Sequence, residues 1–276
     1  MALASAVGYG VSDFVGGIAS RRVAALRVVL VSYPIGVVLL TAVAVIVGGE
    51  VSADAIVWGG LSGIFQGLGV WWLYAALGAG PISVVSPLAA VLVAGIPVAV
   101  GVLLGERPGP VAVVGVVLAL VAVVLVSREV ADKDVTPHRF TATVAWLTFG
   151  CGVAFGLNFV VLHRAPVDAG MWPLVFARIA ATVLVVVVAA VSGNLRIPTG
   201  TPLRLAVLAA LIDTVTNMAV LLALQSSMLS LAGVLISLYP AATVLLAITV
   251  LRERVHVWQV VGMVLALAAV AMIAAG

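Results

Sequence analysis

Apolar runs of about twenty residues, separated by short clusters of charged residues, make up most of this 276-residue sequence. An α-helix needs about twenty apolar residues to cross roughly 30 Å of hydrocarbon. A strand of an outer-membrane barrel would instead alternate polar and apolar side chains over about ten residues. Only 8% of the residues are charged, against roughly 25% in an average soluble domain. The sequence therefore predicts an all-α polytopic membrane protein.

Breaks at charged residues, glycine and proline divide the chain into ten candidate membrane spans. The predicted spans are residues 2–20, 28–47, 55–78, 82–104, 110–127, 140–162, 170–192, 203–224, 229–251 and 255–275. The longest polar stretch, from Ser127 to Arg139, separates two sets of five spans. We expect a multi-pass protein of an inner or plasma membrane, with no soluble domain large enough for a conventional active site.

The two halves of the chain resemble each other. A shift of 147 residues places "LGERPGPVAVVGVVLALVAV" (104–123) on "LRERVHVWQVVGMVLALAAV" (251–270), with 12 of 20 positions identical. A similar match places Asp13 on Asn158. Because each half has an odd number of spans, the second half must enter the membrane in the opposite orientation. This arrangement is the inverted-topology repeat of secondary transporters.

The order of short motifs in each half resembles the EamA repeat of the drug/metabolite transporter superfamily. The motifs are "SDF" (12–14), "LNF" (157–159), "LYP" (238–240), "GERPGP" (105–110) and "RERVHV" (252–257). The resemblance covers nearly the whole chain, and it departs from the repeat pattern where Tyr33 takes the place that Arg178 has in the second half.

The resemblance implies ten transmembrane helices, with residues 1–129 as the first repeat, 130–139 as a connecting loop and 140–276 as the second repeat. It also implies secondary active transport, with export favoured, of small organic metabolites such as amino acids or related compounds. Alternating access around a midplane cavity would be driven by exchange or by protons. The expected partners are the small-molecule substrate and the lipid bilayer, and the chain would act as a monomer or a homodimer.

Three charged residues lie deep inside predicted spans: Asp13, Arg178 and Asp213. A charge near the bilayer centre costs at least about 2.5 kcal/mol on insertion scales, so each should face the bundle interior and a partner. Arg178 can pair with either acid, which leaves the other as the candidate for a substrate or proton site. Asp213 is our first candidate for that role, unless it is only the counter-ion of Arg178.

Further candidates for the cavity are uncharged polar residues inside spans. Asn217 follows Asp213 by one helical turn and shares its face. Gln66 lies in the middle of its span, where its amide needs polar neighbours. Asn158 is expected to line the cavity opposite Asp13, or else to bond between helices. Trp72 and Tyr74 are also candidates, although an interfacial aromatic belt is favoured for them.

Other residues near the ends of spans are expected to be structural. Glu106 and Glu253 read as turn charges or gate contacts, and the three histidines, His138, His163 and His256, read as solvated or interfacial.

Competing functions have little support in the sequence. No HExxH, GxSxG or adjacent acid pair suggests an intramembrane enzyme, and no soluble segment suggests a scaffold or receptor. No cofactor or metal site is expected, since the chain has one cysteine and no His/Cys cluster with metal spacing. No nucleic-acid partner is expected either, because the net charge of +3 comes from loop arginines that act as topology signals.

The loop charges also predict the orientation of the chain. Ten Lys and Arg residues follow odd-numbered spans and two follow even-numbered ones, which places both termini outside the cytoplasm. Relatives are often assigned the opposite orientation.

Overall fold

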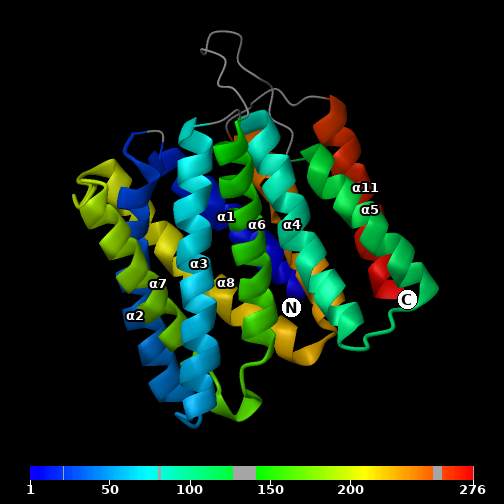
Figure 1. Ribbon diagram of the computed structural model, residues 1–276, viewed down its shortest axis with the longest axis horizontal. Coiled ribbons are helices and arrows are strands. Elements are labelled where there is room, and N and C mark those ends of the chain that lie inside the picture. Colours follow the sequence, from blue (N-terminus) through cyan, green and yellow to red (C-terminus); the bar gives the residue numbers. More distant parts are fainter. Residues whose placement is uncertain (21, 80–81, 127–140, 251–256, 276) are drawn as a thin grey trace.

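The computed structural model describes residues 1–20, 22–79, 82–126, 141–250 and 257–275. Within these ranges the chain forms a bundle of α-helices, one short 3-10 turn and no strand (Figure 1). The elements are α1 (Ala2–Ser20), α2 (Ala25–Val47), α3 (Ala53–Ala79), α4 (Ile82–Leu103), α5 (Pro110–Val126), α6 (Ala142–His163), η1 (Val167–Ala169), α7 (Trp172–Val191), α8 (Thr201–Ser226), α9 (Leu229–Ile236), α10 (Tyr239–Val250) and α11 (Val257–Ala275).

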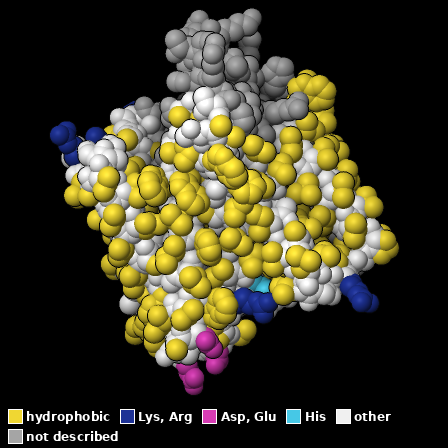
Figure 2. Space-filling view, in the orientation of Figure 1, with side chains coloured by type: hydrophobic (Ala, Val, Ile, Leu, Met, Phe, Trp, Pro, Cys, Tyr) yellow, Lys and Arg dark blue, Asp and Glu magenta, His cyan; other side chains and the backbone are white. Residues whose placement is uncertain are grey.

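The apolar helices agree one by one with the ten predicted spans. Seven stretches, with α9 and α10 together as Leu229–Val250, are long and apolar enough to cross a membrane by length and composition. Three shorter apolar stretches, Leu88–Leu103, Pro110–Val126 and Val257–Ile273, complete the ten. Figure 2 shows apolar side chains over the middle of the visible face and charged ones towards its ends. The prediction of an all-α polytopic membrane protein is confirmed.

The ninth predicted span is interrupted, although its apolar run predicted one continuous helix. α9 ends at Ile236 and α10 begins at Tyr239. Pro240 has no N–H, and its ring clashes with the carbonyl four residues earlier in a regular helix. The backbone instead makes tighter bonds across the break, from Leu238 N–H to the Leu235 carbonyl and from Ala241 N–H to the Leu238 carbonyl. The break leaves α9 as a short half-helix.

The most extensive helix contacts join the two halves of the chain. α3 packs on α6 and α7, α1 packs on α8, and α5 lies beside α11 at one edge of the bundle (Figure 1). Glycines allow the closest approach: a Cβ at Gly59 would collide with the Pro173 carbonyl, and one at Gly63 with the Ala177 carbonyl. The two halves therefore form one interlocked bundle.

One end of the bundle, which we name the closed end, carries the α2–α3, α4–α5, α6–α7 and α8–α9 connections. An apolar cluster seals it, and its buried members include Leu40, Ala44, Leu162, Leu174, Leu221, Leu224, Leu229 and Ala232. Two of the connections also touch, because the Glu50 N–H donates to the Asp168 carbonyl at 3.0 Å. Both termini lie towards this end in Figure 1.

Candidate functional site

A buried ion pair joins α7 to α8. The Nη2 of Arg178 donates to the Oδ2 of Asp213 at 2.6 Å, and the side chains are 2% and 23% exposed respectively. Of the two acids that the sequence offered as partners, the structure therefore selects Asp213. No described residue forms an ion pair with Asp13, whose side chain is exposed on α1.

Two residues of α2 lie against the side chain of Arg178. Its central carbon lies 4.6 Å from the centroid of the Tyr33 ring, a cation–π distance. A Cβ at Gly36, one helical turn further on, would lie 3.1 Å from the Nε of Arg178. Tyr33 occupies the repeat position of Arg178, so two matching positions of the inverted repeats meet in the folded chain.

A hydrogen-bonded chain extends from the backbone carbonyl of Asp213 to α1. The Nδ2 of Asn217 donates to the Asp213 carbonyl at 2.7 Å, and the Tyr9 hydroxyl donates to the Oδ1 of Asn217 at 3.1 Å. The ring of Tyr9 also makes an edge contact with Tyr239, the first residue of α10. The polar groups of α1, α7 and α8 are thus tied together beside the broken helix.

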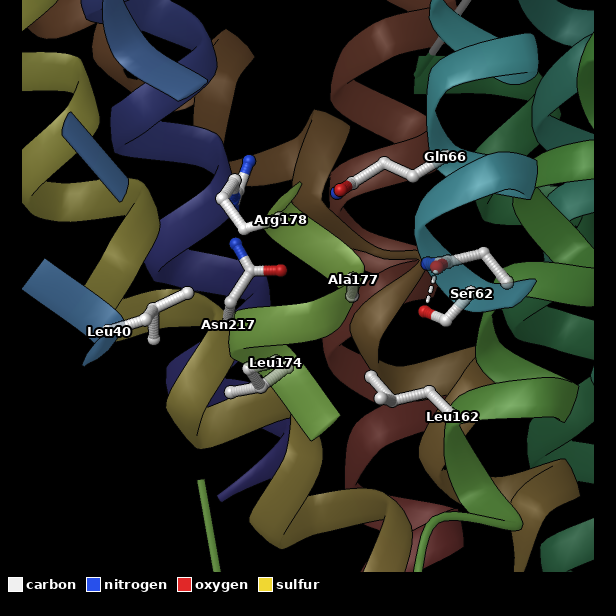
Figure 3. A pocket seen from close by; sticks show the side chains of 9 residues that line it. Leu40, Ser62, Gln66, Leu162, Leu174, Ala177, Arg178 and Asn217 are labelled. Atoms are coloured by element: carbon white, nitrogen blue, oxygen red, sulfur yellow. Dashed lines mark hydrogen bonds between the residues drawn. The ribbon is translucent and has the colours of Figure 1, made fainter. Parts of the chain in front are cut away.

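A small cavity lies next to the ion pair, between the two repeats (Figure 3). Repeat one supplies Leu40, Ser62 and Gln66, and repeat two supplies Asn158, Leu162, Leu174, Ala177, Arg178 and Asn217. In Figure 3, Leu162 and Leu174 lie opposite Gln66, and both leucines belong to the cluster of the closed end. The space admits about one water molecule, so no metabolite fits in this conformation.

Two side chains that line the cavity have N–H donors available for further hydrogen bonds. The Nη1 of Arg178 is buried and has no hydrogen-bond partner among the described residues. The Ser62 hydroxyl donates to the Oδ1 of Asn158 at 2.6 Å, which leaves the Asn158 amide NH₂ as a donor. The cavity therefore offers N–H donors to a hydrogen-bond acceptor.

Trp72 and Asp13, two further predicted site residues, do not line this cavity. Trp72 packs against α6, where a Cβ at Gly150 would meet its ring at 2.9 Å. The side chain of Tyr74 lies outside the described part of the structure.

The residues at span ends have varied surroundings. Glu106 accepts two backbone hydrogen bonds at the start of α9. The Nδ1 of His163 lies 2.5 Å from the Leu224 carbonyl, whereas Glu253, His138 and His256 lie outside the described residues.

The sequence pattern alone did not single out Tyr9, and it marked Tyr33 only as a departure from the repeat. A usable signal existed for both. Tyr9 stands one helical turn before Asp13 on α1, and Tyr33 stands at the repeat position of an intramembrane arginine. The contacts that give these tyrosines their roles depend on the packing of α1, α2, α7 and α8.

The fold and the cavity define a class: a polytopic helical membrane protein in which two five-span halves enclose a polar site between them. The chain belongs to the EamA-like transporter family, which matches residues 1–128 and 142–275. The crystal structure of another protein has the same fold, with a TM-score of 0.74, 17% sequence identity and coverage of 98% of both chains. A search of curated protein sequences gave no significant match. The chain is thus a membrane transporter of the drug/metabolite transporter superfamily, as the motifs predicted.

Proposed function

We propose that the protein is a secondary active transporter of small organic metabolites, working by alternating access around the cavity beside Arg178. The observation that carries this proposal is that both repeats line one polar cavity. Inverted-repeat transporters bind their substrates near the midplane at the repeat interface. Because the cavity admits about one water molecule in this conformation, binding requires the surrounding helices to move apart.

The donors of the cavity favour a substrate that carries a carboxylate, as amino acids do. Arg178 is held on one side by Asp213 and on its face by Tyr33, while its buried Nη1 has no hydrogen-bond partner in the described part of the chain. An unsatisfied buried donor costs about 1–3 kcal/mol, and a substrate oxygen would recover that energy. A hydrogen bond from a guanidinium to a carboxylate is among the stronger ones in proteins.

Asp13 is the acid that we assign to proton or cation coupling. Asp213 is already paired with Arg178, whereas Asp13 is exposed and has no cationic partner among the described residues. Because an ionised acid facing lipid would be costly, the exposed side of Asp13 should face water.

The face of α1 that carries Asp13 suggests the route to the cavity. Tyr9, one turn before Asp13, is packed against Asn217 and Tyr239. A Cβ at Gly16 or Gly17, one turn after Asp13, would meet no atom of the described residues within 4 Å. Among the described residues, packing along this face is therefore closer at Tyr9 than after Asp13. With the predicted orientation, the closed end lies outside and the route leads to the cytoplasm, as an exporter requires for loading.

Counterflow in proteoliposomes tests the function. Vesicles loaded with an unlabelled metabolite should accumulate the labelled compound, and paired probes such as alanine and alaninamide should differ in favour of the carboxylate. Equal exchange of both members of each pair would refute carboxylate recognition. No exchange across a broad metabolite panel would refute transport, and would favour a scaffold, a receptor or an intramembrane enzyme.

A further inference from the structure

One carboxylate bridges the two repeats at the closed end. Glu106, in the turn after α4, accepts a hydrogen bond from the Leu229 N–H at 2.5 Å and another from the Ser230 N–H at 2.9 Å. These N–H groups begin α9, where backbone donors have no partner within the helix. A negative charge is favoured there by the helix dipole. We name the contact of Glu106 with Leu229 and Ser230 the α9 clasp.

The local fold of α4 shapes the α9 clasp. The Glu106 N–H donates a hydrogen bond to the Gly101 carbonyl at 3.0 Å. Gly105 supplies the positive φ of +94° that this turn needs. A Cβ at Gly101 would collide with the Glu106 carboxylate and would lie 3.1 Å from the Ser230 nitrogen. A glycine at position 101 is therefore required for the carboxylate to fold back onto α9.

The half-helix that the clasp holds is part of the seal over the cavity. Leu229 and Ala232 of α9 are 0% and 1% exposed, and both belong to the apolar cluster of the closed end. Leu162 and Leu174 of the same cluster also line the cavity. The break after Ile236 separates α9 from α10, so α9 can shift without displacing the whole span.

We infer that Glu106 is a positioning residue that holds the closed end shut, and that the α9 clasp breaks when this end opens. This inference rests on the proposed alternating access. The two hydrogen bonds run from the second repeat to the first, so any separation of α9 from the α4–α5 turn must break them. Strengthening or weakening the clasp then shifts the balance between the two accessible states of the transporter.

Thiol labelling measures this balance directly. Ala232→Cys, in a Cys151→Ala background, places a thiol inside the seal. In the parent it should react slowly with a membrane-impermeant maleimide added at the closed end. Glu106→Gln puts an amide NH₂ against one backbone N–H, and we expect roughly tenfold faster labelling from that end, as for the loss of one charge-assisted hydrogen bond. Glu106→Asp, which keeps the charge on a shorter side chain, should give an intermediate rate.

Two further variants separate a clasp from general loosening. Gly101→Ala keeps the carboxylate but displaces it, and should accelerate labelling as Glu106→Gln does. Glu50→Gln removes an exposed acid at the same end and should leave the rate unchanged. Unchanged labelling in both clasp variants, or equal acceleration from both membrane faces, would overturn the inference. The assay needs no substrate, so its failure is distinguishable from the absence of counterflow.

Discussion

The guanidinium of Arg178 lies 2.6 Å from the carboxylate of Asp213, across the interface of α7 and α8. This pairing assigns different roles to the two intramembrane acids. Asp213 neutralises the buried arginine, while Asp13 remains exposed without a cationic partner among the described residues. The ion pair also fixes the orientation of Arg178, so that the rest of its guanidinium borders the cavity.

Removal of Arg178 should destabilise the protein by leaving Asp213 unpaired. Breaking a buried pair on one side costs on the order of 3 kcal/mol, and we expect Arg178→Gln to lower stability to denaturant in detergent by about that amount. The double variant Arg178→Gln/Asp213→Asn removes both charges and should recover part of the loss. A double variant less stable than Arg178→Gln would contradict the pairing.

The ring of Tyr33 should contribute through its face and not through its hydroxyl. Tyr33→Phe keeps the aromatic face over Arg178 and should have nearly native thermal stability. Tyr33→Leu removes the cation–π contact and should cost about 0.5–2 kcal/mol. The measurement is the melting temperature of each purified variant in one detergent. Equal melting temperatures for the Phe and Leu variants would argue against the cation–π contact.

Proton coupling should depend on Asp13. Asp13→Asn cannot bind a proton at that position, so uptake driven by an imposed pH gradient should fall to the level of protein-free liposomes, while exchange of substrate continues. Asp213→Asn should retain a response to the gradient, because Asp213 serves as the counter-ion of Arg178. Loss of the response in Asp213→Asn alone would reverse the two assignments.

Contact between α3 and α7 should tolerate no side chain at Gly63. A Cβ there would collide with the backbone carbonyl of Ala177, and overpacking of this kind costs about 1–3 kcal/mol. Gly60→Ala is the matched control, since a Cβ at Gly60 meets no described atom within 4 Å and alanine favours the helix by up to about 1 kcal/mol. Gly63→Ala should therefore lower the melting temperature, and Gly60→Ala should raise it. Similar melting temperatures for the two variants would count against this packing.

The loop charges predict that the closed end and both termini lie outside the cytoplasm. A C-terminal alkaline phosphatase fusion should then be active in cells, and a fusion to a fluorescent protein that matures only in the cytoplasm should be dark. The reverse result would place the closed end in the cytoplasm. The proposed route would then lead to the outside of the cell, and the assignment of the cavity would not change.

The membrane-spanning architecture could be predicted from the sequence because it depends on local quantities. A run of apolar residues long enough to cross the hydrocarbon lowers its free energy by insertion wherever it lies in the chain. The motifs around Glu106 and Gly115 recur in the second half of the chain. This recurrence indicated that the two halves are repeats of one family. The break before Pro240 had a local signal too, but a proline inside an apolar run does not reveal whether neighbouring helices accommodate a kink or a full interruption.

Tertiary structure alone decided which side chains meet. The sequence placed Asp13, Arg178 and Asp213 inside spans, yet the choice of partner for Arg178 depends on how α1, α7 and α8 are rotated and packed. The same holds for Tyr33 over Arg178 and for Glu106 at the start of α9. Within the bilayer, helix rotation is set by close packing and interhelical hydrogen bonds. These forces act between residues far apart in the chain, so no local pattern determines them.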